Sequence, residues 1–228
     1  MKALLEVFFD PGRLFSSLPE RRAAWLVPLF ANTILLVLST VITVNAIGID
    51  QIMRQRLASS SMSPDQMRQA MERATSPVAV YATYGAVAVV TPLSMLVVAG
   101  VLAAFGMMTA RPPKFGSMLA MVCLAFFPYF LVTVLMTVLV LIAAPDKTAL
   151  DINNILATNV GAFVNRSDTS KGLYALYTSL DLLSFIEIGL LSFGFSRLTK
   201  AGFAAGLGAV SGLWILYVMS KMAMSLFQ

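Results

Sequence analysis

The sequence contains no histidine and a single cysteine, Cys123. Without histidine, acid–base catalysis by imidazole and metal binding through imidazole nitrogen are both excluded. A single cysteine cannot form a disulfide within the chain, so cysteine usage does not indicate the redox compartment. Charged residues are also scarce, at 12% of the sequence compared with about 25% in an average soluble domain.

Motifs that would indicate an enzyme or a nucleic-acid-binding protein are missing as well. There is no Walker A, GxSxG, HExxH or CxxC pattern. The net charge of +5 is spread along the chain and is not gathered in a run of like charges. We therefore expect a non-enzymatic protein that has no cofactor, no metal site and no nucleic-acid partner.

Long apolar stretches make up most of the sequence. A helix needs roughly 20 apolar residues to cross a hydrocarbon core of ~30 Å. In lipid, each backbone polar group must be satisfied within its own segment, which leaves helices as the physical solution. We predict an all-α, multi-pass protein with one membrane domain over 24–220 that contacts the lipid bilayer. Its five predicted transmembrane helices are 24–47, 78–108, 118–144, 176–195 and 203–219.

Three segments outside the predicted spans have helical patterns. Residues 1–23 combine a leucine and phenylalanine face with basic residues, which favours a cytoplasmic interfacial helix over a solvated tail. The connection between the first two spans contains a capping box formed by Ser63 and Gln66, which predicts a short helix. The connection between spans three and four is predicted to hold another short helix, over 149–158. The sequence therefore predicts a helix in each of these two connections, which are the extracytoplasmic loops of the topology argued below.

The number of basic residues on each side of the membrane does not by itself decide the orientation of the protein. The 16 lysines and arginines divide equally between the two sides of the predicted topology. Their positions favour one orientation, because Arg21 and Arg22 directly precede the first span and the connections 111–114 and 197–200 are short and basic. We therefore predict a cytoplasmic N-terminus and an extracytoplasmic C-terminus.

The fourth span contains both carboxylates that lie inside a predicted span. A charged residue at the centre of a span costs about 2.5–3.5 kcal/mol on insertion scales and indicates function by default. Thr178, Asp181, Ser184 and Glu187 recur every three residues, so they are expected to form a polar strip along one side of a helix. We predict that this strip is a binding or coupling site. A capping or anchoring role is also open for Asp181.

Glu187 is the deeper of the two carboxylates, and no lysine or arginine is predicted at its depth. Three states remain open for it: a protonated acid, a hydrogen bond to another helix, or contact with a wet cavity. The second span offers candidate partners for such a bond in Tyr81, Tyr84 and Thr91.

Prolines and glycines are the other notable residues of the spans. Pro92 and Pro128 lie within the second and third spans, where proline kinks a helix, and a kink that shapes packing is favoured over a moving gate. The fifth span has two GxxxG pairs, so we expect its small face to pack closely against another helix of this chain or of a second copy. The paired glycines are Gly202, Gly206, Gly208 and Gly212. The large residues expected to face lipid are Phe203, Leu207, Val210 and Trp214.

Three pieces of the sequence resemble one family. The pieces are FFDPGRLFSSLPERRAAWLVPL, KFGSMLAMVCLAFFPYFL, and TNVGAFV followed by SLDLLSFIEIGLLSFGFSRLTKAGFAAGLGAVSGLWIL. In their order and spacing they are similar to bacterial Yip-domain membrane proteins, relatives of the eukaryotic Ypt/Rab-interacting membrane proteins. The chain departs from the usual family pattern at Leu183, Ile186 and Glu187, so the resemblance implies no role for Glu187.

The resemblance implies five spans, a cytoplasmic N-terminus, an outward C-terminus and no enzymatic activity. Bacterial members often accompany macrolide-exporter-type ABC transporters and their periplasmic adaptor proteins. We therefore expect an accessory or scaffold subunit of a transport complex in the bacterial inner membrane, with an ABC transporter or a periplasmic adaptor as its partner. The alternative is a small-solute or lipid transporter that uses the polar strip, in which a homo-oligomer supplies the missing half of an inverted repeat.

Overall fold

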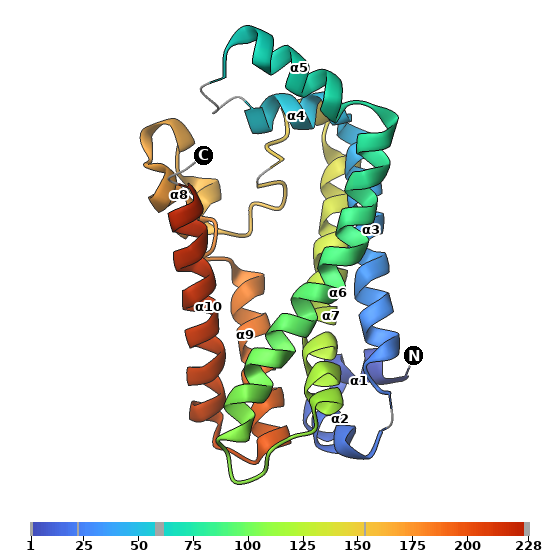
Figure 1. The fold of residues 1–228 in the computed structure, drawn as a ribbon, viewed down its shortest axis with the longest axis vertical. Coiled ribbons are helices and arrows are strands. Elements are labelled where there is room, and N and C mark those ends of the chain that lie inside the picture. Colours follow the sequence, from blue (N-terminus) through green and yellow to red (C-terminus); the bar gives the residue numbers. More distant parts are fainter. Residues whose placement is uncertain (1, 22, 58–61, 153, 226–228) are drawn as a thin grey trace.

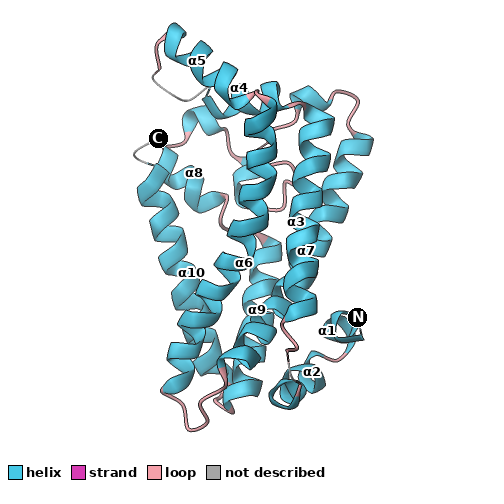
Figure 2. Ribbon diagram, turned by 45° about the vertical axis from the view of Figure 1, so that its right-hand side comes forward, coloured by secondary structure: helices cyan, strands magenta, loops and turns pink. Residues whose placement is uncertain are grey.

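Five long helices form the body of the computed structural model, which describes residues 2–21, 23–57, 62–152 and 154–225 (Figure 1). The five helices are α3 (Leu26–Ile47), α6 (Pro77–Met107), α7 (Phe115–Ala143), α9 (Leu182–Thr199) and α10 (Phe203–Ser225). Each is long and apolar enough to cross a membrane. Within the described ranges no β-strand occurs, and Figure 2 shows helices joined by loops. The prediction of an all-α, multi-pass membrane protein is therefore confirmed.

Shorter elements cover the two ends of this bundle. We call the end that carries the N-terminal helices the basal end, and the opposite end the distal end (Figure 1). The basal elements are α1 (Lys2–Phe9), α2 (Pro11–Ser17) and the 3₁₀ turn η1 (Leu18–Glu20). The distal elements are α4 (Ile49–Leu57), α5 (Pro64–Ala74), α8 (Lys171–Tyr177) and the 3₁₀ turns η2 (Lys147–Ala149), η3 (Val160–Phe163) and η4 (Arg166–Asp168).

Local capping explains why the short helices begin where they do. The Asp10 side chain accepts a hydrogen bond from the backbone N–H of Arg13 at 3.1 Å, which starts α2. The predicted capping box is present at the start of α5, where Ser63 and Gln66 each accept a backbone hydrogen bond from the other. Arg22, which entered the orientation argument, lies outside the described residues.

The helix predicted over 149–158 is absent from the described part of that segment, which has turns and extended backbone after η2. Gln55 of α4 explains the difference. Its side-chain amide donates to the carbonyl of Leu150 at 2.8 Å and accepts from the N–H of Ile152 at 3.0 Å. These bonds satisfy backbone groups that a helix would otherwise pair internally, so the segment lies along α4 instead.

The fourth span begins later than predicted, and the predicted start at 176 is wrong. Residues before it belong to α8, whose C-terminal cap is Thr178. The Asp181 carboxylate then accepts the backbone N–H of Leu183 at 3.3 Å and starts α9. An aspartate that satisfies a free N–H of the first turn favours a new helix start at that position.

The buried core lies in the basal half of the bundle. Residues Ser117–Ala125 of α7 are all buried, and they are surrounded by side chains from the other long helices and from α1 and α2. In the distal half of α7 only Val134, Thr137 and Leu141 are buried. Figure 1 shows α9 and α10 diverging from α3 and α7 toward the distal end, with α6 crossing between the two groups.

The packing face of α10 differs from the predicted small face. A Cβ on Gly206 would overlap the carbonyl oxygen of Ser192 in α9, whereas a Cβ on Gly208 would meet nothing within 4 Å. The same open space surrounds Gly202 and Gly212. Of the four glycines, Gly206 alone therefore makes the close helix contact within the chain. Packing of Gly208 against a helix of a second copy stays a prediction.

The bulky side of α10 is also not uniformly directed toward lipid. Val210 is 3% exposed, although it was expected to face lipid together with Phe203, which is 50% exposed. Trp214 contacts the Phe185 ring of α9, with 6.0 Å between the ring centroids. The buried residues of α10 are Gly206, Val210 and Val218. Their spacing by multiples of four produces the ridge that packs against α9.

Candidate functional site

The predicted polar strip is divided between two helices. Thr178 ends α8 and Asp181 precedes α9, so only Ser184 and Glu187 lie within the fourth membrane helix. The structure brings Asp181 and Ser184 together, with 3.5 Å between the Ser184 hydroxyl and the Asp181 carboxylate. The four residues therefore do not line one side of one helix, because the chain changes direction between residues 178 and 181.

A lysine that the sequence analysis did not select completes this region. Lys221 of α10 donates hydrogen bonds to the hydroxyls of Thr178 at 2.9 Å and Ser179 at 3.1 Å. We call Thr178, Ser179, Asp181, Ser184 and Lys221 the distal polar cluster. The signal in the sequence was a lone cation directly after the predicted end of the fifth span. Its contacts tie the C-terminal part of α10 to the turn between α8 and α9.

The start of α9 is also held by the preceding loop. The N–H of Val160 donates to the carbonyl of Leu180, and the N–H of Leu182 donates to the carbonyl of Thr158, both at 3.2 Å. These two bonds form an isolated antiparallel bridge between Asn159 and Asp181. Asp181 thus has a clear structural role as a helix cap inside a hydrogen-bonded loop.

Glu187 has none of the proposed partners from the second span. Tyr81 is 73% exposed and stacks edge-on against Tyr84, while the Thr91 hydroxyl donates to the carbonyl of Val87 in its own helix. Across the described residues, none forms a hydrogen bond or an ion pair with the Glu187 carboxyl group. The predicted hydrogen bond from Glu187 to α6 is therefore wrong.

The groups that do approach Glu187 are acidic or phenolic. Asp181, which caps α9, Glu187 of α9 and Tyr217 of α10 all lie near enough to interact electrostatically with the hydroxyl of Tyr129 in α7. Glu187 is half-buried, and Tyr217 is 61% exposed. The described residues contain no cluster of three or more His, Cys, Asp or Glu side chains that could hold a metal ion. The chemistry available here is proton exchange and hydrogen bonding.

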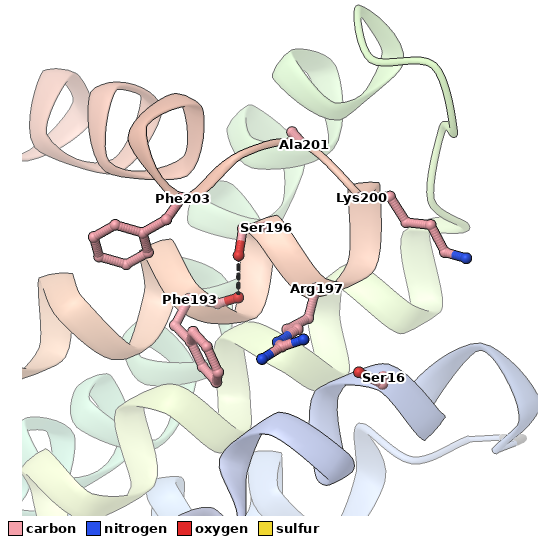
Figure 3. A pocket seen from close by; sticks show the side chains of 7 residues that line it. All are labelled: Ser16, Phe193, Ser196, Arg197, Lys200, Ala201 and Phe203. Carbon is pink, nitrogen blue, oxygen red and sulfur yellow. Dashed lines mark hydrogen bonds between the residues drawn. The ribbon is translucent and has the colours of Figure 1, made fainter.

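The basal end contains a cavity of about 530 Å³ between α2 and the turn that joins α9 to α10 (Figure 3). Its lining residues are Ser16, Phe193, Ser196, Arg197, Lys200, Ala201 and Phe203. Figure 3 shows that Ser16 comes from the α2 side and the others from α9, the turn and α10. The cavity therefore combines two cationic side chains, two hydroxyls and two aromatic rings.

The distal half contains a smaller cavity of about 250 Å³ that is lined mainly by α3, α4 and residues of the 150–155 loop. Hydroxyl side chains from three of the spans and one arginine face it. They are Ser39, Thr40, Thr43, Thr83, Thr137 and Arg56. The hydroxyls of Thr40 and Thr83 are already used, since each donates to a carbonyl of its own helix. Sequence reasoning missed this cavity, although the three hydroxyls within residues 39–43 of α3 were the available signal.

A buried asparagine at the centre of the bundle was also missed. Asn32 of α3 is fully buried, and its amide donates to the Cys123 carbonyl of α7 at 2.7 Å and lies 3.8 Å from the Met95 sulfur of α6. Pro92 lies three residues before Met95 and Pro128 lies five residues after Cys123, and both prolines are inside continuous helices. The sequence did contain a signal for this contact, because Asn32 is a polar residue within an apolar span and such residues often bond to a neighbouring helix.

Comparison with known proteins adds no assignment to this geometry. A scan against protein-family models, a search of curated proteins and a search of solved structures each found no match to the chain. The similarity to Yip-domain membrane proteins therefore stays a prediction.

Proposed function

We propose that this chain is a non-enzymatic accessory or scaffold subunit of a membrane transport complex in the bacterial inner membrane. In this proposal the N-terminus is cytoplasmic, and the distal end is extracytoplasmic. The partner is an ABC transporter or a periplasmic adaptor protein, in keeping with the similarity to Yip-domain proteins. The observation that carries the proposal is an exposed helical arm at the distal end.

The distal arm consists of α4 and α5, which lie across the end of the bundle in Figure 1. None of the residues of α5 is buried, although a capping box stabilises its first turn. Its less exposed face contains Met67 and Met71, and Arg68 and Arg73 are on the exposed side. An amphipathic helix that is ordered by its own caps and has little contact with the bundle suits a protein interface.

The charges of the arm are free to engage a partner. Arg68 pairs with Asp65 at 3.5 Å, but both side chains are at least three-quarters exposed, at 75% and 84%. Such an exposed pair contributes only about 0.2–1 kcal/mol, so a partner carboxylate can displace it at little cost. We therefore place the docking surface on the exposed side of α5, which carries both Arg68 and Arg73.

Charge reversal tests this proposal. Arg68→Glu combined with Arg73→Glu should remove a partner that copurifies with the native chain in mild detergent, as quantified by mass spectrometry. The matched control is Lys147→Glu combined with Lys171→Glu, which makes the same change in net charge at the same end but off the arm. Partner recovery that is equal in the two double variants would contradict a docking role for the arm.

A small-solute or lipid transporter is the second candidate, and Glu187 is the observation that favours it. A carboxyl group inside a span with no hydrogen-bonding partner among the described residues is free to exchange a proton with a substrate or with water. Liposomes that contain this chain alone provide the test. Substrate-dependent proton flux that is abolished by Glu187→Gln would favour the transporter. No such flux with the native chain would favour the accessory subunit.

A further inference from the structure

The basal cavity has the chemistry of an anion site. Arg197 and Lys200 both contribute to its lining and both side chains are exposed. Neither forms an ion pair with any described carboxylate. Two unpaired cations on one concave surface attract a group that carries negative charge and several acceptor oxygens.

The acidic residues at this end do not neutralise the cavity. Glu6 pairs with Arg21 at 3.2 Å and lies 4.0 Å from the Lys2 ammonium group. Asp10 caps the first turn of α2, and the exposed Glu20 of η1 forms no ion pair with either cavity cation. No carboxylate lines the cavity itself, so its potential is set by Arg197 and Lys200.

The arginine is held in position by its surroundings. Its guanidinium carbon lies 4.8 Å from the centre of the Phe193 ring, which lines the same cavity. A Cβ added to Gly12 would lie 3.8 Å from Arg197 Nη2, so the backbone of α2 passes close to the guanidinium group. This packing restricts the side chain while its N–H groups remain without a carboxylate partner, which lowers the entropy lost on binding an anion.

The lysine occupies a backbone conformation that usually selects glycine. Lys200 ends α9 with φ at +54°, in the left-handed region where a Cβ carries a steric cost. The chain therefore places a cation on the cavity rim at a position where glycine would be more stable. Phe203, the first residue of α10, also lines the cavity, so the positive end of that helix dipole adds to the field.

The setting of the cavity corresponds to the headgroup level of a membrane. The long apolar helices α9 and α10 meet at its turn, and α2 runs beside it (Figure 3). At the same end of the bundle, Leu5 and Phe9 of α1 are 63% and 85% exposed, as expected for side chains that enter the acyl region. A volume of about 530 Å³ also exceeds what a bare phosphate ion requires.

We propose that the cavity bounded by Ser16, Arg197 and Lys200 is a phosphate-binding site for the headgroup of an anionic phospholipid. Arg197 donates two parallel hydrogen bonds to phosphate oxygens, and Lys200 supplies a second positive charge. Phe193 and Phe203 contact the glycerol and the first acyl carbons. Soluble phosphate offers the same oxygen chemistry, and the experiment separates the two sources.

The test measures ligand-dependent thermal stabilisation of the full chain in non-ionic detergent. The probes are dioctanoyl phosphatidylglycerol, dioctanoylglycerol, which has no phosphate, and inorganic phosphate. Phosphatidylglycerol should stabilise the native chain, and dioctanoylglycerol should not. Arg197→Gln combined with Lys200→Gln should weaken the apparent affinity about tenfold or more, since two charge-assisted contacts are removed.

The matched control is Arg111→Gln combined with Lys114→Gln, two exposed cations in the α6–α7 connection outside the cavity lining. This control should retain the native affinity. Should the cavity variant fold poorly, Ser16→Asp serves instead, because it adds a repelling carboxylate and leaves Arg197 on Phe193.

Each outcome decides the proposal. Binding of phosphatidylglycerol alone, with dependence on the cavity cations, supports a lipid headgroup site. Binding of inorganic phosphate with the same dependence supports a phosphate site that takes soluble ligand. Equal loss of affinity in the cavity and control variants, unchanged affinity in the cavity variants, or no stabilisation by either phosphate probe would overturn it.

Discussion

Substitution of one glycine should reveal where α10 packs against α9. Alanine at position 206 adds a Cβ that overlaps the carbonyl oxygen of Ser192 and lies 3.2 Å from its carbonyl carbon. Both atoms belong to helix backbone, so neither can rotate away, and the two helices must separate. A separation of about 0.5–1 Å already removes a quarter to a half of each dispersion contact at the crossing.

The size of the effect follows from a comparison with Gly208→Ala. Both substitutions gain roughly 0.8–1.0 kcal/mol of helix propensity, because both positions lie inside α10. Overpacking at a tight contact costs about 1–3 kcal/mol, and only Gly206→Ala incurs it, since nothing lies within 4 Å of a Cβ at Gly208. We therefore expect Gly206→Ala to be less stable than Gly208→Ala by about 1–3 kcal/mol.

Thermal unfolding in one mild detergent measures this difference. For a chain of this length, 1 kcal/mol corresponds to a change of about 2–4 °C in melting temperature. The fraction of protein that remains monodisperse after stepwise heating should fall at a lower temperature for Gly206→Ala. Identical melting temperatures for the two variants, or a higher one for Gly206→Ala, would show that the α9–α10 crossing is not at Gly206.

Three other substitutions test single contacts of the bundle and its orientation in the membrane. Asn32→Ala should lower the stability in detergent by about 0.6–1.7 kcal/mol, because it removes the buried hydrogen bond to the Cys123 carbonyl; unchanged melting would show that this bond contributes nothing. Glu187→Leu should be at least as stable as the native chain, since no hydrogen bond is lost and an apolar side chain enters lipid; clear destabilisation would reveal a partner for the carboxyl group. In a Cys123→Ser background, an impermeant maleimide should label Lys171→Cys in intact cells and should label Lys114→Cys only after permeabilisation. Both native side chains are exposed, so labelling reports sidedness. The reverse labelling pattern would show that the orientation is opposite to the predicted one.

Serines at positions 60 and 117 are less suitable labelling sites than Lys114 and Lys171. Ser117 lies in a basic connection by sequence, but it is 8% exposed and packs in the core, so its labelling would report burial. Ser60 lies outside the described residues. Lys114 and Lys171 lie on opposite sides of the membrane in the predicted topology, and both side chains are exposed.

Several features of this fold could be predicted from the sequence because their causes are local. Lipid offers no hydrogen bonds to the backbone, so each long apolar stretch has to become a helix regardless of its neighbours. The caps at Asp10 and Ser63 act within three residues, and the capping box predicted at Ser63 is confirmed. The start of α9 at Asp181 follows the same local rule, and the capping role left open for Asp181 is confirmed. The apolar residues before Asp181 nevertheless placed the predicted start of the span too early.

Tertiary structure alone decided which surfaces meet. The glycines at 202, 206, 208 and 212 form two equivalent GxxxG pairs in the sequence, yet of these only Gly206 closely approaches another helix of the chain. The rotation of α10 about its axis is set by the ridge that includes Val210 and Val218. The partner of Lys221 and the central contacts of Asn32 depend likewise on how separate helices align. The basal cavity joins Ser16 to Lys200 across most of the chain length. Periodicity within a span determines that a helix forms, whereas its neighbours determine which of its faces is buried.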